Sequence, residues 1–467
     1  MAIDAALKDL ARSLGSDRIV TDDEVLQSYA IDESEAAPVL PDAAVRVRSA
    51  TDVEAVMRSA SAHDVPVTAR GAGTGRTGGA VPSAGGIVLA FEQMDDILGI
   101  ERDDMTVTVQ PGVVLAQLQA AVEAEGLFYP PDPNSMHTCT LGGNVAENAA
   151  GPRTLRYGST RDYVLGLTAV GADGTRLQTG KQTIKGVTGY DLTSLLVGSE
   201  GTLAITTELT LKLIPNPPAI VTMMVLLPDL PTAGRAVGAA LSMGLLPRCI
   251  EMLDERTLSI VRPQAAVPIM DSARAMLIVE LDGEAQALEG QMERCGNAMD
   301  DAGALEVLVA SHSGERERLW SARRELSRSL RGNAKFKLAE DVVVGRSKIP
   351  ELIDSCNRIS DRHGIEMPSY GHAGDGNIHV NFLWNDEGEK KTVDRAVEDL
   401  FERVIELGGT LSGEHGIGIL KAPYLSLEQS PQVIALQERI KDLFDPRGIL
   451  NPGKIFPGQH RKFHGAC

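Results

Sequence analysis

The sequence predicts an α+β protein of more than one domain, and three observations support this class. The chain has 467 residues, and at about 150 residues per domain this length corresponds to two or three domains. Residues 40–215 alternate β-branched runs with glycine-rich turns and amphipathic helical patterns. After a cluster of three prolines, Pro215, Pro217 and Pro218, apolar strand patterns alternate with longer helical patterns.

The patterns place the elements in a definite order. Strands are expected at 46–48, 66–68, 86–90 and 105–109, and helices at 52–63 and 114–125. Beyond the proline cluster, strands are expected at 223–227, 276–281 and 334–344, and helices at 315–331, 392–407 and 431–444.

Composition limits the function classes. Hydrophobic residues make up 43% and charged residues 23% of the chain, which is typical of a soluble globular protein. The net charge of −19 argues against nucleic-acid binding. No secretory signal or membrane-spanning run is visible. The five cysteines are scattered without a CxxC motif, which predicts a reducing, cytoplasmic location and no iron–sulfur cluster in this chain.

A glycine-rich run, residues 70–79, follows the strand pattern at 65–69. Glycines let backbone N–H groups gather around a diphosphate without hindrance from a Cβ. A Rossmann motif would need a helix next, but residues 75–86 contain five glycines and a proline. The run therefore predicts an anion-binding loop without that helix, and the alternative is a turn that binds nothing.

Further glycine-rich and rigid segments occur at 129–134, 140–151, 157–158 and 198–203. Each alone is typical of a turn. Together they are hard to explain without a large extended cofactor, because they offer backbone donors and permit close approach by a flat ring.

These segments in this order resemble the FAD-binding domain of the vanillyl-alcohol oxidase superfamily. They are most similar to the group that contains the glycolate oxidase flavin subunit, cytochrome-type D-lactate dehydrogenase and D-2-hydroxyglutarate dehydrogenase. The resemblance extends over about residues 44–456. It implies an N-terminal helical segment at 1–40, a PCMH-type FAD-binding domain at 41–217, an α+β substrate domain at 218–425, and a C-terminal segment at 426–467 that returns to the FAD domain.

The resemblance also implies how FAD is held. Members with covalent flavin carry a histidine in the glycine-rich loop, and none lies between Arg70 and Val81, so noncovalent FAD is expected. The implied FAD contacts are Arg70, Gly71, Ala72, Gly73, Thr74, Gly75, Gly78, Pro131, Asp132, Thr140, Gly142, Gly143, Asn144, Asn148, Gly151, Tyr157, Gly158, Glu200, Gly201, Ile205 and Asn451. In the FAD-binding segments three positions depart from the family pattern: Arg76 replaces leucine, and Ala150 and Ala204 replace glycine.

Histidines gather in two glycine-rich motifs of the second half. His379 and Asn381 are two residues apart, so on a strand they share a face, and His372 precedes a turn that can bring it beside His379. Glu414 and His415 stand next to each other between glycines. Two imidazoles and a carboxylate are a typical open metal set, and the alternative is hydrogen-bonded structural histidines.

The resemblance implies roles for these residues. His372, His379 and Glu414 match positions that bind a divalent metal, zinc, and His415 matches the catalytic base. The substrate contacts that it implies are Arg323, Ser327, Lys337, Asn381 and His415. Arg323 and Ser327 are four apart on a predicted helix, and guanidinium is a natural partner for a carboxylate.

The implied activity is FAD-dependent oxidation of a small 2-hydroxy acid, D-lactate or glycolate, to the 2-oxo acid. As a hypothesis, Arg323 and Lys337 hold the carboxylate, a metal lowers the pKa of the 2-hydroxyl, His415 takes its proton, and hydride passes to flavin N5. The electron acceptor is left open among a quinone, a cytochrome, an electron-transfer protein and an iron–sulfur subunit, and a homodimer is left open as the assembly.

Four alternatives remain at this stage. The chain could be a D-2-hydroxyglutarate dehydrogenase, or the flavin subunit of a multi-subunit glycolate oxidase that needs an iron–sulfur partner. It could also be a non-catalytic flavin-binding paralogue, or a metal-dependent hydrolase without redox chemistry.

Overall fold

The computed structural model describes residues 2–324 and 326–456, apart from the side chains of Ser327 and Arg328. These residues form two compact units. Unit 1 comprises the described parts of Met1–Ala150, Ser159–Asn216 and Glu414–Cys467, and unit 2 comprises Gly151–Gly158 and Pro217–Gly413. Each unit is thus assembled from segments that are distant in the sequence.

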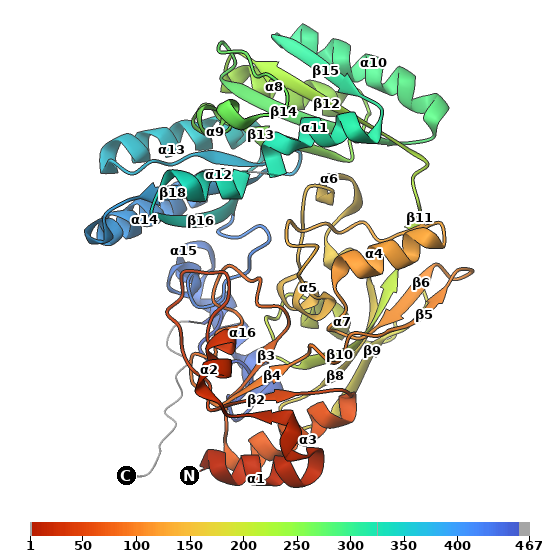
Figure 1. Cartoon of the computed structure of the whole chain (residues 1–467), viewed down its shortest axis with the longest axis vertical. Coiled ribbons are helices and arrows are strands. Elements are labelled where there is room, and N and C mark those ends of the chain that lie inside the picture. Colours follow the sequence, from red (N-terminus) through yellow and green to blue (C-terminus); the bar gives the residue numbers. More distant parts are fainter. Residues whose placement is uncertain (1, 325, 457–467) are drawn as a thin grey trace. The chain divides into compact units, whose positions relative to one another are not determined.

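Unit 1 contains a four-stranded sheet in the order β1-β2-β4-β3 and a five-stranded antiparallel sheet in the order β5-β6-β10-β8-β9 (Figure 1). Its described helices are α1 Ala2–Leu14, α2 Asp23–Leu26, α3 Ala50–His63, α4 Leu115–Ala124, α5 Leu141–Glu147, α7 Leu192–Leu196, α15 Leu425–Glu428 and α16 Pro431–Phe444. Its described strands are β1 Ile19–Val20, β2 Ala43–Arg46, β3 Val67–Arg70, β4 Ile87–Ala90, β5 Ile97–Glu101, β6 Thr106–Val109, β7 Leu127–Phe128, β8 Val164–Val170, β9 Arg176–Gly180, β10 Ile205–Lys212 and β11 Ile214–Pro215.

The crossover helix α3 makes the parallel part of unit 1 possible. β2 and β3 both pair with β4 in parallel, and α3 connects them. The Ser49 side chain accepts from the Asp52 N–H at the start of α3, and Asp64 ends it in the left-handed conformation at φ 53°. Met57 of α3 belongs to one buried apolar cluster with Leu10 of α1 and Leu89 of β4, so α1, α3 and the sheet share one core.

Unit 2 is built on a seven-stranded antiparallel sheet in the order β15-β12-β14-β13-β17-β18-β16. Its described strands are β12 Ala219–Leu227, β13 Cys249–Leu253, β14 Ala275–Gly283, β15 Glu306–Ala310, β16 Phe336–Val343, β17 Ser369–His372 and β18 Asn377–Trp384. Its described helices are α6 Thr154–Tyr157, α8 Leu230–Ser242, α9 Glu255–Val261, α10 Ala285–Ala302, α11 Ser313–Arg324, α12 Leu326–Asn333, α13 Ile349–His363 and α14 Lys390–Glu406.

One face of this sheet is covered by α9, α11 and α12. Leu258, Leu319 and Leu326 from these helices share an apolar cluster with Ile278 and Tyr370 of the sheet. The covering helices therefore exclude water from the strand residues that point to this face.

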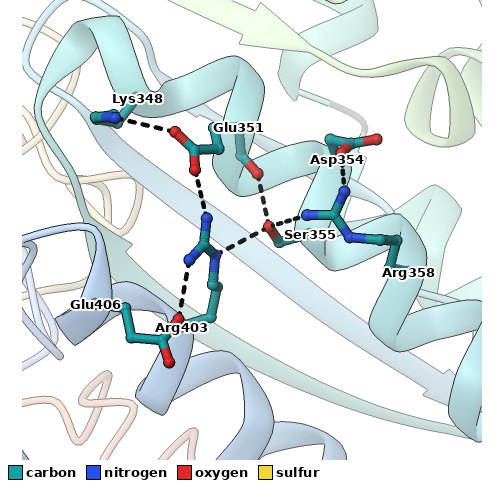
Figure 2. A network of polar contacts seen from close by, with 7 residues as sticks. All are labelled: Lys348, Glu351, Asp354, Ser355, Arg358, Arg403 and Glu406. Atoms are coloured by element: carbon teal, nitrogen blue, oxygen red, sulfur yellow. Dashed lines mark hydrogen bonds and ion pairs between the residues drawn. The ribbon is translucent and has the colours of Figure 1, made fainter.

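Helices α13 and α14 are joined by a network of charged side chains, which Figure 2 shows. Arg403 of α14 donates to Glu351 of α13 at 2.5 Å, to Ser355 at 3.2 Å and to Glu406 at 2.9 Å. The groove beside this network has a volume of about 390 Å³. The guanidinium of Arg403 donates hydrogen bonds to carboxylates and a hydroxyl of these two helices. The network therefore holds the helices together and, as a surface network, contributes modestly to stability.

Several boundaries differ from those expected from the sequence. The expected strand at 46–48 lies earlier, as β2, because its pairing with β4 runs from Ala43 to Arg46. The expected helix at 315–331 consists of α11 and α12, and Glu325 between them lies outside the described residues. The last segment of unit 1 begins at Glu414. None of the described helices is long and apolar enough to cross a bilayer.

The C-terminal segment is anchored in unit 1 by a buried lysine. Lys441 Nζ donates to the carbonyls of Thr202 at 2.7 Å and Leu450 at 2.8 Å, and to Asp445 Oδ2 at 2.5 Å. Burial lowers the pKa of Lys441, and the Asp445 carboxylate partly opposes this shift. One ammonium group thus joins α16, the tail that follows it and the loop before β10.

We expect Lys441→Met to destabilise unit 1 by about 3–5 kcal/mol, because it leaves the buried Asp445 carboxylate without its cation. The measurement is chemical denaturation of the FAD-loaded protein followed by circular dichroism. Arg447→Ala is the matched control, since Arg447 pairs with Asp64 at the surface, where the two side chains are 50% and 63% exposed; its effect should stay below about 1 kcal/mol. Equal effects of the two variants would contradict the anchoring role.

Candidate functional site

The register of unit 2 gathers polar side chains on one face of its sheet. Residues directly opposite on antiparallel strands point to the same side. Glu251 of β13 lies opposite His372 of β17, and His379 of β18 lies opposite both Tyr370 of β17 and Asp341 of β16. By alternation along the strands the same side also receives Asn381 and Lys337. We call this set the polar face: Glu251, Lys337, Asp341, His372, His379 and Asn381.

The two histidines of the polar face are close together and buried. Their ring centroids are 5.2 Å apart with the rings nearly perpendicular, and their exposed fractions are 4% and 7%. His372 Nδ1 is 2.5 Å from Glu251 Oε1, an arrangement that assigns the proton to Nδ1 and leaves Nε2 as a ligand atom. The turn before β18 is supported by Asp375, whose Oδ1 accepts from the Asn377 N–H at 3.1 Å.

Glu414 is placed by the residues just before it. Asp341 accepts from the Gly413 N–H at 2.6 Å and from Ser412 Oγ at 3.2 Å. Glu414 is peptide-bonded to Gly413, and one ligand atom from each of His372, His379 and Glu414 lies within 4.8 Å of the other two. Two imidazoles and one carboxylate that converge in this way fit a divalent cation with open coordination positions.

Arg323 of α11 reaches the polar face through Glu251. Its Nε donates to Glu251 Oε2 at 2.7 Å, and its guanidinium lies 4.7 Å from the centroid of the Tyr370 ring. Burial acts to raise the pKa of Glu251, but its interactions with His372 and Arg323 outweigh burial and hold this pKa below its usual value.

Glu251 is the residue that the sequence analysis missed. It lies in the apolar run Cys249–Leu253, every residue of which is buried. A single carboxylate in such a strand requires a buried partner, and this requirement is the signal that could have identified it.

The other expected substrate contacts differ in what the structure shows of them. Lys337 lies opposite Leu383 at the partly exposed end of the polar face. Asn381 is fully buried, and its Nδ2 donates to the Pro368 carbonyl at 3.2 Å and the His379 carbonyl at 3.3 Å. Its Oδ1 accepts no hydrogen bond from any described residue, which suits a donor on a bound molecule. The expected contact of the Ser327 side chain lies outside the described residues.

In unit 1 the glycine-rich run follows β3 as a loop, as the sequence predicts. Arg70 folds back, and its guanidinium donates to the Ser28 carbonyl at 3.1 Å and the Ile31 carbonyl at 2.6 Å. Gly73 has φ +70°, and a Cβ there would lie 2.2 Å from the Arg70 guanidinium. Arg70 and Gly73 therefore shape this loop, whose Ala72 is exposed and whose Thr74 and Gly75 are partly exposed.

Gly142 and Gly143, which precede Asn144, have different roles. A Cβ on Gly142 would lie 2.6 Å from Pro111 Cβ, so Gly142 is required for packing. A Cβ on Gly143 would meet only Thr140 Oγ1, at an ordinary 3.5 Å, so this side of α5 is open to a ligand. Thr140 is the N-cap residue just before α5. Its buried Oγ1 neither accepts a capping hydrogen bond nor bonds another described residue. This unused hydroxyl beside open backbone fits a polar group of FAD.

His415 is fixed to the same loop region of unit 1. Its carbonyl accepts from Thr77 Oγ1 of the glycine-rich run at 3.1 Å. Just beyond it, the N–H groups of Ile417 and Gly418 donate to Glu200 at 2.8 Å each. Burial raises the pKa of Glu200, although these two N–H groups favour its charged form. Glu200 thus anchors the segment that carries His415.

Asn451 returns from the C-terminal tail to these loops. Its Nδ2 donates to the carbonyls of Gly79 at 3.0 Å and Glu200 at 2.7 Å. Its Oδ1 is buried and bonds no described residue. Asn451 therefore joins the glycine-rich run to the loop before β10.

The remaining expected FAD contacts are distributed as follows. Gly201 follows Glu200 at φ +66°, and Ile205 begins β10. The Pro131 carbonyl accepts from Gln119, and Asn148 Oδ1 accepts from the Arg161 N–H. Gly151, Tyr157 and Gly158 belong to unit 2, where Tyr157 donates to Asp282 at 2.7 Å. This bond and an Arg156–Asp282 ion pair hold their segment there.

Comparisons with known families identify both parts of the chain. Residues 41–180 match the family "FAD binding domain", and residues 216–455 match "FAD linked oxidases, C-terminal domain". Glycolate oxidase subunit GlcD of Bacillus subtilis is 40% identical over 436 residues, which cover 93% of each chain. D-lactate dehydrogenase of Anaerostipes hadrus is 35% identical over 95% of this chain and 96% of its own. D-2-hydroxyglutarate dehydrogenase of Stutzerimonas stutzeri is 32% identical over 97% and 99%.

Solved structures share the fold at low sequence identity. p-Cresol methylhydroxylase superposes with a TM-score of 0.82 at 16% identity, covering 98% of this chain and 97% of its own. 4-Ethylphenol oxidase from Gulosibacter chungangensis has a TM-score of 0.79 at 21% identity, covering 98% of each chain. The expected α+β fold with a PCMH-type FAD-binding domain is thereby confirmed.

We expect Gly143→Ala to leave the FAD-free fold intact and to weaken FAD binding. Alanine should stabilise α5 by up to about 1 kcal/mol, while its methyl group obstructs the cofactor and raises the Kd about tenfold or more. FAD titration by flavin fluorescence and thermal unfolding of the FAD-free protein measure the two effects. Gly290→Ala in α10, where a Cβ meets nothing within 4 Å, is the control. Unchanged FAD affinity in Gly143→Ala would contradict this position for the cofactor.

Proposed function

The chain belongs to the family of FAD-linked oxidases and is an FAD-dependent oxidoreductase, and on this premise we propose that it oxidises a small 2-hydroxy acid to the 2-oxo acid. D-lactate or glycolate is the proposed substrate. The observation that carries the proposal is the buried arrangement of Arg323, Glu251 and His372, which sets a carboxylate-binding group beside a metal-ligating one. The names of the relatives, which include glycolate oxidase and D-lactate dehydrogenase, support the same substrate class.

Charge balance supports a substrate with a single carboxylate. Arg323 and Lys337 contribute two positive charges at the polar face, and Glu251 and Asp341 contribute two negative charges. These four charges cancel. A divalent cation together with its ligand Glu414 then adds a net charge of +1, which one substrate carboxylate neutralises. A dicarboxylate would bring a second negative charge into buried surroundings, at a cost in free energy.

The residues have distinct tasks in the proposed reaction. Arg323 and Lys337 bind the substrate carboxylate, and Asn381 Oδ1 accepts from a substrate donor. His415, fixed by Thr77 and Glu200, accepts the proton of the 2-hydroxyl, for which a neutral imidazole is suited near pH 7.

Two groups supply the chemistry that side chains lack. His372, His379 and Glu414 would hold the divalent metal, zinc in our proposal, and when bound it makes a coordinated hydroxyl more acidic. FAD, held noncovalently by the loops of unit 1, is the hydride acceptor when bound.

A second candidate function concerns the protein that accepts electrons from the reduced flavin. The chain could be the flavin subunit of a larger glycolate oxidase, a possibility that the subunit names of two relatives favour. Cys139, Cys249, Cys295 and Cys356 are buried thiols, so iron–sulfur centres would come from a partner. Buried free thiols are also why we propose a reducing, cytoplasmic location.

We expect the flavin absorption band to bleach when the purified protein is mixed anaerobically with D-lactate or glycolate. Bleaching reports hydride transfer alone and needs no electron acceptor. D-2-hydroxyglutarate should reduce the flavin more slowly, and L-lactate and acetate serve as controls for stereochemistry and for simple anion binding. Faster bleaching by D-2-hydroxyglutarate would overturn the monocarboxylate preference, and no bleaching by any of the three acids would overturn the substrate class.

Removal of the metal should abolish most turnover and leave FAD in place, because the proposed ligands and the FAD loops are different residues. The measurement combines chelator treatment, metal analysis and the flavin spectrum, followed by zinc addition to restore turnover. His363→Asn is a control, since this histidine pairs with Asp399 at the α13–α14 surface, whereas His379→Asn should lose zinc. Full turnover after verified metal removal would contradict a role for the metal.

A further inference from the structure

We propose that Glu251 is a positioning residue that sets the metal-ligating His372 and the carboxylate-binding Arg323 at a fixed separation. This inference rests on the proposed function of the polar face. Glu251 uses one oxygen for each partner: Oε1 is 2.5 Å from His372 Nδ1, and Oε2 accepts from Arg323 Nε at 2.7 Å. A planar carboxylate has a fixed distance between its oxygens, so both contacts together determine where the imidazole and the guanidinium lie.

The backbone of Glu251 gives the bridge a rigid base. β13 lies inside the sheet between β14 and β17, and Glu251 is paired with Ile278 on one side and His372 on the other. Its exposed fraction is 0%. The side chain therefore has no water to replace either partner, and the loss of either contact would leave a buried polar group unsatisfied.

The charge of Glu251 determines the proton position on His372. A carboxylate only accepts hydrogen bonds, so the neutral imidazole must carry its proton on Nδ1 and present Nε2 without a proton. The same carboxylate accepts from Nε of Arg323 and so orients the guanidinium. One residue thus prepares both the metal ligand and the anion-binding group.

Glu251→Gln separates this role from simple packing, because glutamine has the same size and reach. Its amide can accept from only one of the two partners. If it accepts from Arg323 Nε, its NH₂ group faces His372 Nδ1 and favours a proton on Nε2, which blocks the ligand atom. If it accepts from His372, the NH₂ group faces the arginine and displaces it.

The first measurement is the ¹⁵N NMR spectrum of histidine-labelled, FAD-loaded protein, with and without zinc. In the wild type we expect His372 with a protonated Nδ1 and a zinc-sensitive Nε2, and in Glu251→Gln we expect a change of tautomer or a loss of the zinc response. Zinc affinity, measured by competition with a chromophoric chelator, should fall 10–100-fold. Neither readout depends on catalysis, so each remains informative if the proposed substrate is wrong.

Kinetics at saturating zinc provide the second measurement. We expect KM for the hydroxy acid to stay raised about tenfold or more in Glu251→Gln, since zinc does not restore the position of Arg323. Glu280→Gln is the matched control. Glu280 is a partly buried glutamate of β14 whose carboxylate accepts from Thr222 and Trp320 at 2.7 Å each. Its replacement by glutamine should leave zinc affinity and KM unaltered.

Glu251→Asp covers the case in which the glutamine variant does not fold. Aspartate keeps the charge but is one methylene shorter, so it cannot span both partners, and it should weaken zinc binding, raise KM, or both. The proposal is overturned if the folded variants retain the wild-type His372 tautomer, zinc affinity and KM, or if Glu280→Gln shows the same losses. A wild-type protein whose His372 binds no zinc and carries its proton on Nε2 also overturns it.

Discussion

The register of β13, β17, β18 and β16 is the constraint on which the chemistry of unit 2 depends. Antiparallel pairing places Glu251 opposite His372, and His379 opposite Asp341. A slip of one residue in any of these strands would turn its polar side chains to the opposite face. The convergence of Glu251, His372 and His379, which we propose to serve a metal site, is therefore a consequence of strand pairing and not of a local motif.

In unit 1 the positions of the proposed cofactor-binding loops are fixed by hydrogen bonds to the backbone and not by strand register. Its loops contain many glycines and little regular structure, so they need fixed points. Glu200, Asn451 and Lys441 provide these points, because each is buried and each bonds backbone groups of segments far apart in the sequence. The segment that carries His415 and the glycine-rich run are joined through Thr77 in the same way. Backbone donors and acceptors, which do not change with side-chain identity, thus carry much of the precision of this unit.

Much of this arrangement was predictable from the sequence because it depends on local patterns. The strand–glycine loop at Arg70, the shared face of His379 and Asn381, and the break near Pro217 all follow from period, turn chemistry and composition. The Glu251 bridge was not predictable, since it joins β13 to residues more than seventy positions away. The contacts that Asp341 and Glu200 make with backbone N–H groups around Glu414 also join residues far apart in the sequence, so no local pattern indicates them.

The two charged networks of unit 2 show why burial distinguishes a ligand-binding arrangement from a network that only joins two helices. In the α13–α14 network, Arg403 shares Glu351 and Glu406 where these acids are 43% and 65% exposed, so water can replace any partner at little cost. Around Glu251 no such replacement is available, and each charge must be matched by a protein group or by a ligand. The buried contacts of Glu251 with Arg323 and His372 therefore suit the binding site that we propose, whereas the exposed α13–α14 network only joins two helices.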